Sequence, residues 1–137
     1  MVRKVLGVIA GVVVAMLLVM IIEMVGHYVF PPPPFDYSDP EARRLAMANA
    51  PAGALLTVLA AYFIAVLAGG WTAGRIAGGL AWPARVVAGL ILLAAVANLF
   101  MLPHPAWFAV LAVLLVVVAG WIAGQLASRG PLVPRRG

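Results

Sequence analysis

The sequence predicts an all-α fold, a four-helix transmembrane bundle made of two antiparallel hairpins. The 137-residue chain is 66% hydrophobic and only 9% charged, whereas a soluble domain is about 45–50% apolar and about 25% charged. Four of its apolar runs are each long enough to cross a bilayer, which takes roughly 20 residues. The last three runs are joined by short connections, which makes successive helices antiparallel neighbours.

The four predicted spans cover about residues 5–30, 52–76, 86–102 and 106–127. The first follows Arg3-Lys4, and its uncharged stretch exceeds the roughly 7–15-residue apolar core of a signal peptide, so we expect a retained span. The second begins after Pro51, because proline is favoured at a helix start. The third ends at Pro103-His104-Pro105, and the fourth starts directly after that corner.

The loop between the first two spans, residues 31–50, is predicted to contain a short helix. Asp39 suits the N-cap, Pro40 suits the first helical position, and Glu41 suits the first turn, so we expect a helix that ends near Ala48. Such a helix would lie on the membrane surface with its arginines in water.

Residues 1–127 are therefore expected to form one membrane domain, followed by a cytoplasmic tail over 128–137. The Leu-Val-Pro-Arg sequence at 132–135 resembles a thrombin cleavage site, so part of this tail is either native sequence or a cloning remnant. We assign no function to it.

The basic residues predict the orientation. With the N-terminus in the cytoplasm, seven basic residues face inward and two face outward, as the positive-inside rule requires. The inward set is Arg3, Lys4, Arg75, Arg85, Arg129, Arg135 and Arg136, and the outward pair is Arg43 and Arg44. The net charge of +5 then reflects the membrane topology. The sequence has no clustered basic face, so it does not predict nucleic-acid binding.

Composition also limits the chemistry. The chain has no cysteine, which excludes disulfides, thiolate metal sites and cysteine nucleophiles. The sequence offers no convergent nucleophile or acid–base set, so nothing in it favours an enzyme.

Small residues at helical spacing form the first candidate feature. They are Gly70, Gly74 and Gly78 near the end of the second span, and Gly120 and Gly124 near the end of the fourth. Glycines one turn apart allow helix backbones to approach closely inside a membrane. We therefore predict helix packing there, and the pattern leaves open whether the contact lies within one chain or between subunits.

Polar residues near the outer boundary form the second candidate feature. Glu23 and His27 are four residues apart on one face of the first span, and His104 lies at a similar depth, about 27 Å from the inner boundary at ~1.5 Å per residue. Asn98 is the deepest uncharged polar group. The sequence thus predicts an outer-rim site of Glu23, His27 and His104, with Asn98 either joining helices or lining a pathway.

The same residues suggest three possible cofactors. Met24 and His27, like Met101 and His104, are three residues apart and offer copper ligands, or two axial histidines for a haem. Glu23 with both histidines would suit zinc. Methionine is also a common filler of apolar cores, so the sequence requires none of these groups.

Two motifs carry a resemblance. Glu23-x-x-Gly26-His27-x-x-x-Pro31 and Asn98-Leu-x-x-x-Pro-His104-Pro-x-Trp resemble motifs in a group of uncharacterised small four-span bacterial integral membrane proteins. The resemblance implies a bacterial inner-membrane location and a role for Glu23, Gly26, His27, Asn98 and His104. It implies no activity.

Three functions follow as expectations. The first is a non-enzymatic protein of the lipid bilayer that acts by helix association, as a homo-oligomer or as an accessory subunit of a membrane complex. The second is a small transporter or channel with an outer Glu/His vestibule. The third is a metal- or haem-binding membrane protein.

Overall fold

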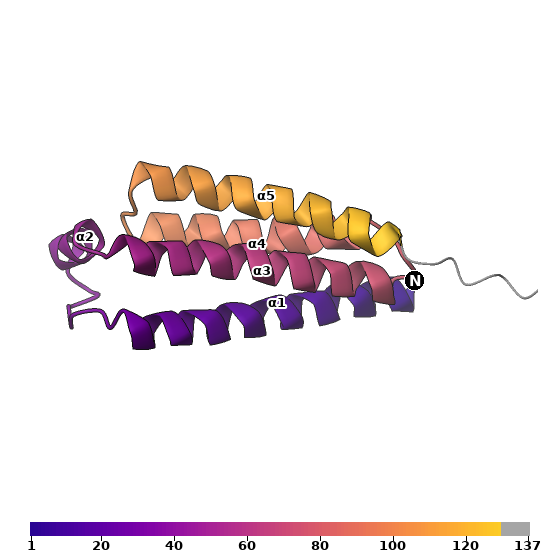
Figure 1. Cartoon of the computed structure of the whole chain (residues 1–137), viewed down its shortest axis with the longest axis horizontal. Helices are drawn as coiled ribbons and strands as arrows, with labels where there is room; N and C mark the ends of the chain where they lie inside the picture. Colours follow the sequence, from indigo (N-terminus) through magenta and orange to yellow (C-terminus); the bar gives the residue numbers. More distant parts are fainter. Residues whose placement is uncertain (130–137) are drawn as a thin grey trace, which may run out of the picture.

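The computed structural model describes residues 1–129 of the chain, and this part contains five helices (Figure 1). They are α1 Val2–Val29, α2 Pro40–Ala48, α3 Ala52–Ile76, α4 Trp82–Met101 and α5 Ala106–Ser128. All but α2 are long and apolar enough to cross a membrane, so the predicted all-α four-helix bundle is confirmed. The 132–135 motif, Arg135 and Arg136 lie outside the described residues.

The four long helices run along the longest axis of the molecule, and α2 lies beyond their ends (Figure 1). The N-terminus and the last turn of α5 lie together at the opposite end, which we call the terminal end. The other is the α2 end. Helix α3 occupies the centre, because it contacts α1, α4 and α5, whereas α1 contacts only α3 and α4 within the described chain.

The helix starts follow local capping chemistry. Helix α2 begins where predicted, and the Asp39 carboxylate accepts a hydrogen bond of 3.0 Å from the Glu41 backbone N–H. Helix α4 begins at Trp82, one turn before the predicted start at 86. The apolar run starts only after Arg85, but Pro83 is favourable in a first turn, so the helix extends beyond the apolar run.

Two glycines end α3. The Gly79 N–H donates to the Gly74 carbonyl at 2.9 Å, and the Gly78 N–H donates to the Arg75 carbonyl at 3.1 Å. The φ angle is 95° at Gly78 and 81° at Gly79, and both values lie in the left-handed region that favours glycine. Gly78 does not pack against another helix of the described chain, because it lies beyond the end of α3 and a Cβ there would meet nothing within 4 Å.

The other predicted glycines have close neighbours within the chain. Gly70 lies against Ala84 of α4 and Ala123 of α5, and Gly120 lies against Ala88 of α4. Gly74 faces Ala127 and Gly124 faces Ala81. Three of these glycines therefore contact another helix of the same bundle, and Gly124 contacts the residue that precedes α4.

The closest approach between α1 and α3 lies elsewhere. The buried residues of α1 are Gly7, Gly11 and Ala15, all in the half of the helix nearer the terminal end. A Cβ on Gly11 would lie 2.5 Å from the Gly69 carbonyl oxygen. We call these three residues the α1 small-residue row. Its Gly-x-x-x-Gly-x-x-x-Ala spacing is plain in the sequence, but the prediction did not include it.

Candidate functional site

Three helices bring polar side chains together toward the α2 end. Gly11 faces Gly69 and Gly26 faces Thr57, so the antiparallel register sets Glu23 about one turn nearer the α2 end than Tyr62. Helical side chains lean toward the N-terminus of their own helix. Glu23 on α1 and Tyr62 on α3 therefore lean toward each other.

Tyr62 connects α3 to α4. Its ring is buried, with 7% of the residue exposed, and its hydroxyl accepts a hydrogen bond of 3.3 Å from Nδ2 of Asn98. Asn98 thus bonds to a neighbouring helix, as polar groups at membrane depth commonly do. Because the Tyr62 oxygen is the acceptor in this bond, its own proton remains to be donated.

Glu23 supplies the charge of this region. The residue is partly buried, and its carboxylate is close enough to His27 and to the Tyr62 hydroxyl to interact with both electrostatically. Among residues 1–129 the only ion pair joins Arg44 to Glu41, so no lysine or arginine of that part neutralises Glu23. We call Glu23, Tyr62 and Asn98 the polar cluster.

The predicted rim of Glu23, His27 and His104 is not assembled. The His27 side chain is exposed rather than turned into the bundle. His104 stacks on Phe108 in the α4–α5 turn, with ring centroids 4.5 Å apart. Within residues 1–129 no three His, Asp or Glu side chains are grouped to hold a metal ion, so the zinc ligand set does not form.

The two methionines among the proposed copper ligands are exposed, whereas His104 is half-buried. Met24 is 66% exposed and Met101 is 68% exposed. Burial lowers the pKa of His104, which outweighs the opposing effect of its hydrogen bond with the Leu102 carbonyl. Nδ1 lies 2.8 Å from that carbonyl oxygen, which can only accept, so Nδ1 carries the proton. This bond holds the imidazole in the turn.

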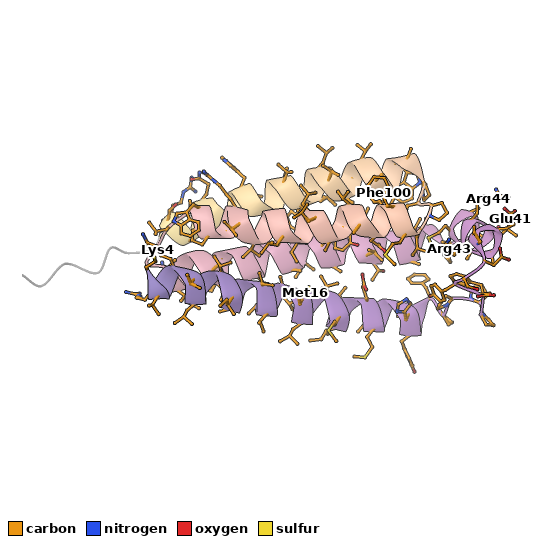
Figure 2. The ribbon with its side chains drawn as sticks, turned by 180° about the vertical axis from the view of Figure 1, so that it is seen from behind. Lys4, Met16, Glu41, Arg43, Arg44 and Phe100 are labelled. Carbon is orange, nitrogen blue, oxygen red and sulfur yellow. The ribbon has the colours of Figure 1, made fainter. Side chains whose placement is uncertain are left out.

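The acids of the outer loop have local partners. The Ser38 hydroxyl and N–H both donate to Asp36 and lower the pKa of its carboxyl. The Arg44 guanidinium likewise lowers the pKa of Glu41. Figure 2 shows Glu41, Arg43 and Arg44 at the end opposite Lys4. These acids are solvated and separate from Glu23, so they add nothing to the polar cluster.

Sequence reasoning missed Tyr62. A tyrosine within an apolar span is unremarkable, and its link to Asn98 depends on the register between two helices that short loops alone do not fix. The signal that could have found it is depth, because Tyr62 lies near the middle of its span, where a phenol can reach an amide on a neighbouring helix. Comparing the depth of each tyrosine within the spans with the depth of Asn98 would have indicated that pairing.

Comparisons with family models, with curated proteins and with solved structures find no match to this chain. What the polar cluster does must therefore follow from its own chemistry. That chemistry is a partly buried carboxylate, a buried phenol and an amide, each on a different helix.

Proposed function

We propose that this protein is a small bacterial inner-membrane transporter or channel whose outer entrance contains the polar cluster. The observation that supports this is the partly buried carboxylate of Glu23 at a junction of three helices, without a lysine or arginine partner in the described chain. Ionisable groups inside membranes are costly, and they commonly mark ion, proton or substrate pathways.

The chemistry of the cluster favours a proton or a small cation. An ionised Glu23 would attract positive charge, the Tyr62 oxygen would offer a second ligand, and the Asn98 side-chain oxygen a third. The half of α1 that carries Glu23 has no buried residue. That half can therefore shift to admit a ligand while the α1 small-residue row stays packed.

Helix association is the second candidate. Of the glycines that suggested it, Gly70, Gly74 and Gly120 are already packed against other helices of the same chain, which leaves no room there for a partner. The observation that still favours it is a row of exposed, large apolar side chains along α1, where a second copy or another subunit could pack. The row includes Leu6, Ile9, Val13, Met16, Met20 and Met24. The oligomeric state in detergent distinguishes this candidate from a monomeric transporter.

The proposed orientation places both termini in the cytoplasm, which would put the polar cluster near the outer face. Labelling with a membrane-impermeant thiol reagent tests it, because the chain has no native cysteine. We expect a Ser38→Cys variant to be labelled in intact spheroplasts. A Ser128→Cys variant should react only after the membrane is permeabilised. The reverse pattern would contradict the orientation.

The transport proposal predicts that Glu23→Gln abolishes most cation or proton flux into proteoliposomes. A charged partner contributes roughly 1.5–3 kcal/mol to a hydrogen bond, so its loss corresponds to a decrease of about tenfold or more. Flux of protons, Na⁺ and K⁺ would be measured with fluorescent indicators.

Glu41→Gln is the matched control, because it removes an exposed acid outside the polar cluster. Tyr62→Phe should lower flux in the same direction as Glu23→Gln, because it deletes only the hydroxyl. Wild-type flux no greater than that of empty liposomes, or flux unchanged by Glu23→Gln, would overturn the proposal.

A further inference from the structure

An open groove of about 310 Å³ lies between α4 and α5 near the terminal end of the bundle. It is independent of the polar cluster, which lies toward the other end. Its lining includes Arg85, Gly89, Leu92, Val117, Gly120 and Trp121.

The groove is hollow beside Gly89. A Cβ added at Gly89 would meet nothing within 4 Å, so the α4 side of the groove has no side chain at that point. The remaining walls are aliphatic, and Val117 is 53% exposed on the outside of the bundle. In a bilayer this surface faces lipid, so the natural content of such a groove is hydrocarbon.

One end of the groove is positively charged. Arg85 is exposed in the first turn of α4, one turn before Gly89, and it forms no ion pair within residues 1–129. No side chain caps the start of α4, so its first backbone N–H groups add a partial positive charge beside Arg85. Trp121 lines the groove at the same end, where tryptophan typically marks the headgroup level.

We propose that this groove binds an anionic phospholipid, with one acyl chain against Gly89 and Leu92 and the phosphate against Arg85. The apolar walls select a hydrocarbon chain, and the cationic end selects a negatively charged headgroup. Basic pockets between transmembrane helices bind anionic headgroups in this way. The ligand would come from the leaflet next to the terminal end.

Native mass spectrometry of the full-length protein in detergent tests the site. The probes are phosphatidylglycerol and phosphatidylcholine with identical acyl chains. We expect phosphatidylglycerol to bind about fivefold more tightly, because one arginine near a charged headgroup contributes about 1 kcal/mol. Arg85→Gln should remove this preference while both lipids still bind.

Gly89→Leu should weaken both lipids, because its side chain fills the groove. Its thermal unfolding should match wild type, since a Cβ there meets no atom within 4 Å and the rest of the side chain enters the open groove. This separates lost binding from misfolding. Arg75→Gln is the matched control. Arg75 lies 6.0 Å from the Trp71 ring and outside the groove, so the preference should persist.

Three results would overturn the proposal. One is equal affinity of the wild type for the two lipids, and another is an unchanged preference in Arg85→Gln. The third is full competition by glycerol 3-phosphate, which would mean that the groove holds an anion without an acyl chain.

Discussion

Replacing Gly11 with leucine is expected to detach α1 from the bundle. The added Cβ alone would lie 2.5 Å from the Gly69 carbonyl oxygen and 2.7 Å from the Ala73 Cβ. Both atoms belong to the helix at the centre of the bundle, so relief requires α1 to move away. Overpacking in a tight core typically costs about 1–3 kcal/mol, and we expect at least the upper value here. Thermal unfolding in detergent would measure it.

Gly89→Leu is the control for this experiment, because it makes the same change where no neighbour lies within 4 Å. It should unfold like the wild type. If Gly11→Leu were equally stable, the α1 small-residue row would not be a packing surface.

Replacing Phe108 with alanine is expected to give the second large effect. Phe108 is among the largest fully buried side chains, and it supports the stacked ring of His104 in the α4–α5 turn. Truncation leaves a cavity that the surrounding helices can only partly fill. Such changes cost about 3–5 kcal/mol in soluble cores. Lipid solvates an apolar side chain as well as the bundle interior does, so the transfer contribution is small in a membrane. We therefore expect a loss of about 2–3 kcal/mol in the free energy of unfolding, from the cavity alone.

Phe100→Ala provides the comparison, because Phe100 is 88% exposed on α4 (Figure 2). Its removal should change the free energy of unfolding by less than about 0.5 kcal/mol. Equal effects of the two truncations would contradict the burial of Phe108.

The sequence was sufficient to predict the helices, for reasons visible in particular residues. Run length identified the four spans, and Asp39 with Pro40 identified the start of α2. The start of α4 was misplaced because the apolar run begins only after Arg85. The helical backbone begins earlier, at Trp82, and includes Pro83 in its first turn. Hydropathy reports where lipid begins, and a helix can extend past that point.

The candidate site was predicted less well. A sequence shows how deep a residue lies in its span, but it does not show toward which neighbour the side chain points. Depth selected Glu23 and Asn98, and the polar cluster contains both. A lipid-exposed helix is apolar on every side, so no amphipathic pattern reports which side faces inward. For this reason His27 was placed in the bundle although it is exposed, and Tyr62 and the α1 small-residue row were missed.

The position of α1 in the bundle has a consequence for biosynthesis. Gly11 is made early, but its neighbours Gly69 and Val87 belong to helices that are translated much later. Before they are inserted, α1 must remain in lipid without α3 and α4, so its glycines stay uncovered. Among the four long helices, α1 therefore waits longest for its native contacts, and a delay in synthesis between α1 and α3 would lengthen that exposure.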